Sequence, residues 1–554
     1  MRANLRVQMY RPMADTPDGP PEPDPRRWFA AAVVIVSVAI PVLDNTVLNV
    51  AIPTILREFH TDLPSLQWVI TGYSLTFATF LIIGGRLGDM YGHRRMFIVG
   101  AAIFGAGSFL ASVSHSVPAL ILGEAIIEGI GASLLLPATL SILSTTFHGA
   151  ERAVAFAAWG TAAGAAVAFG PLVGGFLTTN YSWRWSLRIN VIVAPLFIIG
   201  ALLLMRPDRR PTRRPSIDLP GAAMIASGSF ALVFALSEAA TYGVFRPLRD
   251  FSIAPVAFVV AVAILAGFVV FERAKERRGG DPLFEFSQLR HLGFRYGLQT
   301  TMVLAMGQFG FLLVIPVLLQ DGQHFTALRA GAYMVPMGVF IALGALFGAR
   351  LTRMAGVTRV VRVGLVLEAV GLALVALMIS TDTTLLALLP GSVLFGIGVG
   401  FASSQLTNVI LSDVDVDKAG VASGTNTTVR QVGAALGIAV IGSLLNAQTI
   451  KHAIRSVETI ALPQQVQTAT ISGIHAQGVN FAPPPGTPKA QATALVHALE
   501  QSVVAGARPA LLFAAAVVAL GAVLSLLIPN IGPVSRPSDT SEGAISAFES
   551  IDVA

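Results

Sequence analysis

The chain has no cysteine, and only 12% of its 554 residues are charged. Without cysteine it cannot form disulfides, thiolate nucleophiles or cysteine-ligated metal sites, so the sequence does not reveal its redox compartment. It also lacks the GxxxxGK[ST] phosphate-binding loop, the HExxH metal motif and the nucleophile-elbow motif. These absences argue against ATP hydrolysis and against a membrane enzyme. We therefore predict that the protein is not an enzyme and carries no cofactor or metal.

Apolar residues dominate the composition. They make up 54% of the chain, and the mean hydropathy is +0.70, values that a soluble globular domain does not reach. The lipid bilayer is therefore the first expected partner. The net charge of +6 comes mostly from arginine. These arginines are spread over short loops and not gathered on one polar domain, which argues against nucleic acid as a partner.

Apolar runs long enough to cross a bilayer, roughly 20 residues each, divide the chain into about fourteen expected transmembrane helices. We predict an all-α integral membrane protein with two six-helix halves and two extra central helices. The expected parts are a disordered cytoplasmic N-terminus (1–27), an N-terminal half (28–206), the extra helices and their linkers (207–280), a C-terminal half (281–530) with a long external loop (447–505), and a disordered cytoplasmic tail (531–554).

Arginine clusters occupy alternate loops, including Arg26 with Arg27, Arg94 with Arg95, and the runs 206–214 and 273–278. Cytoplasmic loops carry the excess of positive charge, so these loops are expected in the cytoplasm. An even number of helices then places both termini there too. We predict a multi-pass protein of the bacterial plasma (inner) membrane.

An internal repeat relates the two halves. The loop GGRLGDMYGHRRMF, residues 84–97, returns in altered form as GARLTRMAGVTRVV, residues 348–361. Glu128-Gly-Ile-Gly-Ala likewise corresponds to Phe395-Gly-Ile-Gly-Val. Duplication of this kind is typical of secondary transporters, although chance similarity between glycine-rich segments is the alternative.

Three acids lie inside apolar runs, where a carboxylate costs roughly 2.5 to 3.5 kcal/mol on insertion scales. Asp44 is expected to carry protons, because low dielectric favours the protonated acid; alternatively, it only accepts hydrogen bonds. Glu124 and Glu128 are four residues apart and share one helix face. As a like-charged pair they are expected to hold a proton, a cationic substrate, or either in competition. The alternatives are exposure of Glu124 to water and pairing of one acid with Arg430.

Two glycine-rich motifs are expected to control conformation. In the loop, Gly85, Asp89, Gly92, Arg94 and Arg95 form a predicted latch, with Asp89 capping a neighbouring helix N-terminus; topology determination alone is the alternative. Further along, the set Gly170, Pro171, Gly174 and Gly175 permits a bend and close helix packing. It is expected to act as a pivot or a barrier against proton leak, or simply to pack.

Several of these motifs together resemble a known family. The loop 85–95 resembles that of the major facilitator superfamily, and LDNTVLNVAIP, residues 43–53, resembles the first-helix motif of its fourteen-helix drug:proton antiporter branch. GPLVGG, residues 170–175, resembles the antiporter motif, and Ser182-Trp183-Arg184-Trp185 fits the same branch. The resemblance implies export of amphipathic, often cationic compounds in exchange for protons. One departure stands out, because Ala125 occupies the position of the family's usual arginine.

A roomy, mostly apolar substrate cavity is expected, with candidate residues Trp159, Gln308, Phe309, Gln405, Asn408 and Arg430; each is alternatively an ordinary core residue. The loop 447–505 is expected to be a solvated insertion, with exit gating or a periplasmic partner as alternatives. Two rival functions use the same fold. One is export of an endogenous lipid or secondary metabolite, and the other is a non-transporting membrane scaffold.

Overall fold

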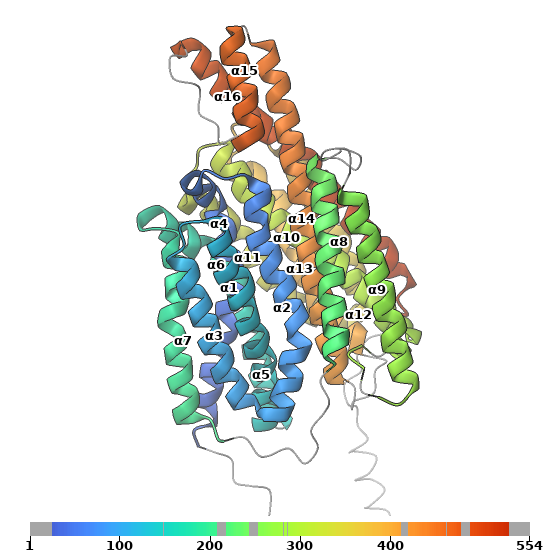
Figure 1. The fold of residues 1–554 in the computed structure, drawn as a ribbon. Helices are drawn as coiled ribbons and strands as arrows, with labels where there is room; N and C mark the ends of the chain where they lie inside the picture. Colours follow the sequence, from blue (N-terminus) through green and yellow to red (C-terminus); the bar gives the residue numbers. More distant parts are fainter. Residues whose placement is uncertain are drawn as a thin grey trace, which may run out of the picture.

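The protein is described by a computed structural model, in which placed residues are 25–147, 149–207, 218–242, 253–280, 282–284, 286–411, 419–460, 462–477 and 488–530. These residues form helices joined by short connections, with no strand among them (Figure 1). The predicted all-α fold is confirmed for this part of the chain. The tail 531–554 and most of the N-terminal segment 1–27 lie outside the described residues.

The helices follow one another closely, and several are longer than a bilayer requires. Their bounds are α1 Arg27–Phe59, α2 Leu63–Tyr91, α3 His93–Ser112, α4 Val117–Leu120, the π-helix η1 Ile121–Glu128, α5 Gly129–Thr146, α6 Gly149–Asn180, α7 Arg184–Leu204, α8 Leu219–Tyr242, α9 Ile253–Arg277, the 3₁₀-helix η2 Phe286–Arg290, α10 Leu292–Asp321, α11 Ala327–Ala355, α12 Val357–Met378, α13 Leu385–Leu411, α14 Ala419–Thr459, α15 Gln464–Gln477, α16 Lys489–Leu524 and the 3₁₀-turn η5 Ser525–Leu527.

Within the described residues, twelve helical segments combine the length and apolar composition needed to cross a membrane. The helices α2 and α6 are not among the twelve, although α2 packs on α5 and α14, and α6 packs on α1 and α11. The chain is therefore a multi-span membrane protein. The count of fourteen spans stays a prediction.

Close glycine contacts repeat between the two halves. In the N-terminal half, Gly107 of α3 packs against the backbone of Glu128. In the C-terminal half, Gly371 of α12 packs in the same way against the backbone of Phe395. A Cβ atom at either glycine would overlap the facing helix, so only glycine permits the approach. These equivalent contacts agree with the sequence repeat that pairs Glu128 with Phe395.

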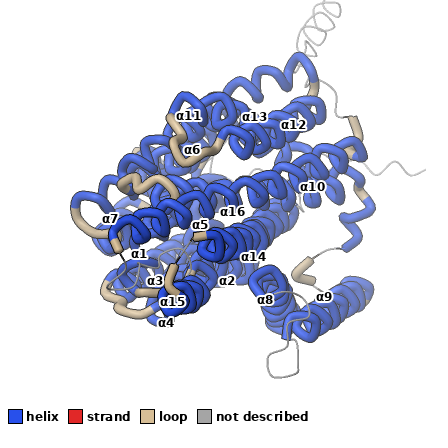
Figure 2. Tube along the Cα trace, turned by 90° about the horizontal axis from the view of Figure 1, so that it is seen from above, coloured by secondary structure: helices blue, strands red, loops and turns tan. Residues whose placement is uncertain are grey.

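The two extra helices, α8 and α9, form a pair beside the main bundle (Figure 2). Trp68 of α2 contacts Phe230 of α8, with ring centroids 5.4 Å apart. At the start of α8, Asp218 pairs with Lys275 of α9 at 2.8 Å. Burial alone would raise the pKa of Asp218, but hydrogen bonds with Glu272, Lys275 and the Gly221 N–H outweigh it and hold the pKa below its ordinary value. This ion pair joins the ends of the two helices.

The segment 447–505 is not the loop that we predict from the sequence. The helix α14 continues through it to Thr459, α15 follows, and α16 begins at Lys489. Buried apolar side chains join these helices, namely Ala453, Val457, Ile474, Leu495 and Leu499. The expectation of a loop is wrong because these apolar residues recur at helical spacing and bury one another. The end of α14, the helix α15 and the start of α16 project beyond the bundle as an extension (Figure 1).

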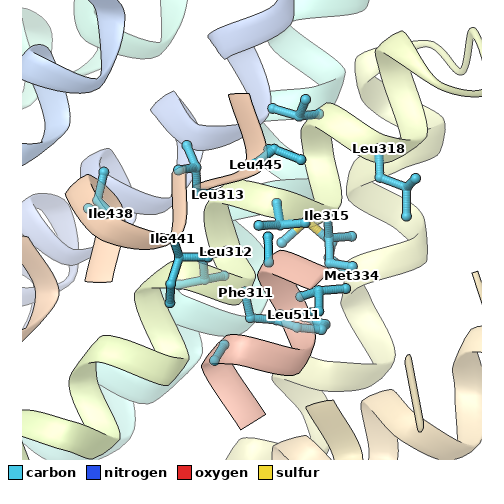
Figure 3. Packing of buried hydrophobic residues seen from close by; sticks show 14 of the residues in the cluster. Phe311, Leu312, Leu313, Ile315, Leu318, Met334, Ile438, Ile441, Leu445 and Leu511 are labelled. Carbon is cyan, nitrogen blue, oxygen red and sulfur yellow. The ribbon is translucent and has the colours of Figure 1, made fainter. Parts of the chain in front are cut away.

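The two halves meet at the end of the bundle where α1 ends and α2 begins. Gln320 of α10 donates a hydrogen bond to the Val50 carbonyl at 2.7 Å, and the Leu328 N–H donates to Thr179 Oγ1 at 2.9 Å. One large apolar cluster contains residues of both halves, and Figure 3 shows residues of α10, such as Phe311 and Ile315, packed in it.

At the opposite end of the bundle, two of the described apolar cores belong to single halves, while a third joins Ile83 of α2 to Phe284 and to the helix pair α8 and α9. One core contains Phe97, Leu143 and Phe197 of the N-terminal half. Another contains Phe294, Leu298 and Ile410 of the C-terminal half. The contacts of Gln320 and Leu328 therefore join the halves directly at one end, whereas two of the cores at the other end belong to single halves.

Candidate transport site

Asp44 lies near the middle of the apolar helix α1 and is only 2% exposed. Its Oδ1 atom accepts a hydrogen bond, but its Oδ2 atom is buried without a partner. A carboxylate in this position would lack most of its hydration and half of its hydrogen bonds. The structure thus places Asp44 where a bound positive charge or proton would stabilise it.

Glu124 and Glu128 lie on η1, which is a π-helix and not the α-helix that the sequence predicts. π-helical segments are rare in proteins, and those that occur are often found at functional sites. Both acids are buried, and oxygen atoms of Asp44, Glu124 and Glu128 all lie within 4.8 Å of one another. From the sequence, Asp44 is one predicted site, and Glu124 with Glu128 is another. The structure brings all three acids together. Their roles stay predictions.

The amide of Asn190 links two of these acids. Its Nδ2 atom donates to Asp44 Oδ1 at 2.6 Å and to Glu128 Oε1 at 3.1 Å. Asn190, which comes from α7, is not among the site residues predicted from the sequence. Its position as a lone amide in an apolar helix is the signal that could have identified it.

Each of the three acids and Asn190 has one buried oxygen atom without a hydrogen-bond partner. Glu124 Oε2, Glu128 Oε2 and Asn190 Oδ1 are buried without hydrogen-bond partners, as is Asp44 Oδ2. Three carboxylates this close together in low dielectric cannot all be ionised without a compensating positive charge. The acids also present the oxygen donors that hard cations prefer. The arrangement can accept protons or another small positive species, and we name it the acid cluster.

Packing explains why alanine stands at position 125, where the resembled family usually has arginine. Ala125 is fully buried, and a Cβ atom at Gly72 of α2 would lie 3.0 Å from the Ala125 side chain. An arginine would not fit between these helices. Arg430, considered as a partner for the glutamates, makes no ion pair with them in the described structure; the acid cluster is bridged by Asn190 instead.

Arg94, expected in the latch, binds the end of a neighbouring helix in its own half. It donates to the carbonyls of Ala201 at 3.0 Å and Leu202 at 2.8 Å, at the C-terminus of α7. In the other half, Arg362 of α12 donates to three carbonyls after α16, those of Ser525, Leu526 and Ile528. The two arginines hold equivalent helix pairs.

Other predicted latch residues have separate places. Gly92 has φ of 102°, a conformation that favours glycine, between α2 and α3. Gly85 lies beside Pro137 of α5, and Arg95 lies in the first turn of α3. The side chain of Asp89 lies outside the described residues. A latch between the halves stays a prediction.

The glycine and proline motif of α6 lies between two helices. Gly170 and Gly174 pack against Thr46 and Val47 of α1. Gly175 packs against the Ala327 backbone of α11, and Gly331 of α11 packs against the Pro171 carbonyl. Because α11 belongs to the other half, this motif forms part of the contact between the halves.

The expected cavity residues lie on four helices. Trp159 of α6 donates to Thr139 Oγ1 at 3.0 Å, and Gln405 of α13 donates to Ser404 at 3.1 Å. Gln308 of α10 is buried with its Oε1 atom unpartnered, and Phe309 packs against the large apolar cluster. The Asn408 side chain lies outside the described residues. Their common cavity stays a prediction.

Two helical halves, apolar outer surfaces and a buried acid cluster define a membrane transporter. Residues 34–438 match the family model described as Major Facilitator Superfamily, and the chain belongs to that family. It is not an enzyme, which confirms the prediction from the sequence.

Relatives named as a transporter and as a resistance protein match most of the chain. The chain is 37% identical over 451 residues to a "Probable actinorhodin transporter" of Streptomyces coelicolor, covering 80% of this chain and 76% of the relative. It is 34% identical over 435 residues to "Puromycin resistance protein pur8" of Streptomyces alboniger, covering 78% and 84%. These relatives confirm the resemblance to the multidrug-efflux branch of the family.

Solved structures support the fold. A bacterial homologue of the human lysosomal transporter Spinster matches with a TM-score of 0.60 and 17% identity, covering 92% of this chain and 100% of that one. At this identity, the similarity is one of fold.

Proposed function

We propose that the protein exports amphipathic or cationic compounds across the bacterial plasma membrane in exchange for protons. The observation that carries this proposal is the acid cluster, in which three buried acids share one amide donor and retain unpartnered oxygen atoms. Asp44 is the first choice of proton carrier. Glu124 and Glu128 hold a second proton or recognise a cationic substrate.

Competition between a proton and a cationic substrate for the acid cluster would couple export of the substrate to entry of the proton. An arriving cation neutralises the carboxylates and displaces a proton, and a returning proton releases the cation. Proton entry supplies about 2.3 kcal/mol per charge for each 100 mV of membrane potential. No other energy source is required.

Alternating access fits the contacts between the halves. With the N-terminus in the cytoplasm, the end closed by the contacts of Gln320 and Leu328 faces outside, and the arrangement is inward-facing. Rocking of the halves about the acid cluster would then expose it outside. The glycine contacts of α6 and α11 would open in that step.

Proteoliposomes provide the test. The protein is reconstituted with an imposed inward proton gradient, a lipophilic cation such as ethidium is added, and internal pH is recorded beside Asp44→Asn. We expect cation-triggered proton movement in the wild type and its loss in the variant. As a matched control, Asp382→Asn removes an exposed acid and should leave coupling unchanged.

A second candidate is export of a secondary metabolite. Two relatives carry names of this kind, the actinorhodin transporter and a "Tetracenomycin C resistance and export protein" of Streptomyces glaucescens, 28% identical over 513 residues. Active wild-type protein that moves neutral aromatic compounds but no cation in the panel would favour this candidate over cation export.

A further inference from the structure

A fourth acid lies inside the membrane, away from the acid cluster. Glu368 of α12 is completely buried, and neither of its carboxyl oxygens has a hydrogen-bond partner. It faces α10, where a Cβ atom at Gly307 would lie 3.2 Å from Glu368 Oε1. The side chains of Leu372 and Val518 lie beside the same glycine. Among the described residues, the side chains beside this carboxyl are apolar and no ion pair with it is present.

The internal repeat relates Glu368 to the acid cluster. In the N-terminal half, Gly131 of α5 packs against the Phe104 backbone, and Gly107 of α3 packs against the Glu128 backbone. In the C-terminal half, the equivalent glycines pack against Glu368 and Phe395. Each helix pair thus carries one acid and one phenyl ring at equivalent positions, with the two exchanged between the paired helices.

Burial without a partner restricts the chemical state of Glu368. An ionised carboxylate at this position would be very costly, so the acid is neutral here. Even a neutral carboxylic acid leaves a buried donor and a buried acceptor without hydrogen bonds, which destabilises the folded protein. A purely structural role would be served better by an apolar side chain. A group that gives up its proton in another conformation has a reason to remain an acid.

We infer that Glu368 is a second proton-binding site, carried by the C-terminal half, which loads and releases one proton in each transport cycle. The inference rests on the proposed antiport function. In the structure described here, the proton is held in an apolar pocket between α10, α12 and α16. A shift of α10 against α12 in the opposite conformation would bring water or a polar group to the carboxyl and allow the proton to leave.

Infrared difference spectroscopy tests the proton directly and requires no transport. Full-length protein in liposomes is taken through a pH series with and without ethidium. We expect a carbonyl band of a protonated carboxyl that responds to pH or ethidium, is absent from Glu368→Gln, and is shifted but retained in Glu368→Asp. The exposed-acid variant Asp382→Asn should keep the band. A band that responds to neither pH nor ethidium would overturn the inference.

Transport provides the second readout. A coupled proton contributes about tenfold to the drug gradient for each pH unit of imposed gradient. We therefore expect Glu368→Gln to lower the steady-state gradient by about that factor while export continues through the acid cluster. An unchanged gradient in the folded variant would assign Glu368 a structural role. If wild-type protein shows no coupling at all, the proposed function fails, and the infrared titration still decides whether Glu368 exchanges a proton.

Discussion

At the residue scale, the chemistry of the protein depends on a few polar groups that the apolar bundle leaves incompletely satisfied. Asn190 is the clearest example, because its amide donates to Asp44 and Glu128 at once. A donor of this kind favours the ionised form of the carboxyl that accepts from it. In the proposed antiport mechanism, Asn190 would therefore set how readily the acid cluster releases its protons.

Replacing Asn190 with alanine should shift the pH dependence of export. Loss of the donor disfavours ionised carboxylates, so the cluster holds its protons to higher pH, and half-maximal coupled export should move upward. Export in proteoliposomes across a pH series measures the shift. The control is Asn180→Ala, at an exposed residue that bonds within its own helix. A downward shift would contradict this role for Asn190.

The acids could be predicted from the sequence because charged residues in apolar runs are rare. Their convergence could not, because Asp44 and Glu128 lie on different helices and meet only through tertiary packing. Asn190 was not predicted because burying a single amide costs less free energy than burying a charge, which makes it a weaker signal in the sequence. Glu368 carries the same signal as Asp44, an acid within an apolar run, but lies outside every recognised motif.

At the element scale, arginines hold antiparallel helix pairs together at both ends. Arg94 binds the C-terminal carbonyls of α7, while Arg184, the first residue of α7, binds the Ser114 carbonyl after α3. In the other half, Arg362 binds the end of α16 and Arg508 of α16 binds carbonyls at the end of α12. Each positive charge also complements the negative end of a helix dipole.

Removing either equivalent arginine should destabilise its own half. Arg94→Ala and Arg362→Ala each lose charge-assisted hydrogen bonds worth roughly 1.5 to 3 kcal/mol apiece, so both should lower the thermal unfolding midpoint in detergent. The control is Arg359→Ala, at an exposed arginine of α12. If Arg94 is also a latch, only Arg94→Ala will change the balance between conformations. If all three variants are as stable as the wild type, the hydrogen bonds of Arg94 and Arg362 do not stabilise their helix pairs, and this prediction is wrong.

The helical extension shows where element prediction from the sequence was limited. Proline-rich and polar stretches around residues 447–505 obscure the apolar periodicity of Ile450, Ala453, Ile454 and Val457, which pack in the extension. Hydropathy finds membrane helices well because spans are uniformly apolar. It is a weaker guide to amphipathic helices in water, whose signal is periodicity and not mean composition.

At the scale of the whole molecule, the contacts between the halves would decide, under the proposed alternating access, which side of the membrane can reach the acid cluster. They join α1 to α10 and α6 to α11 at one end. Because several contacts are glycine against backbone, they fit only when the halves are fully closed. Partial opening would lose them together, which favours two discrete states over a continuum.

Cross-linking this contact should stop the cycle. Since the chain has no cysteine, the pair Thr179→Cys and Leu328→Cys can be introduced without background reactivity. Oxidation should abolish export, and reduction should restore it; each single variant serves as control. Efficient export by the fully cross-linked protein would show that the halves need not separate there.

The extension also gives the C-terminal half a long lever arm. At 41 residues, α14 is about 60 Å long, twice the roughly 30 Å of bilayer hydrocarbon, and it continues unbroken from the membrane into the extension. Any tilt of the C-terminal half is therefore magnified at the tip. A fluorescent or spin label placed there would read out the transport cycle of single molecules without touching the residues proposed to carry protons.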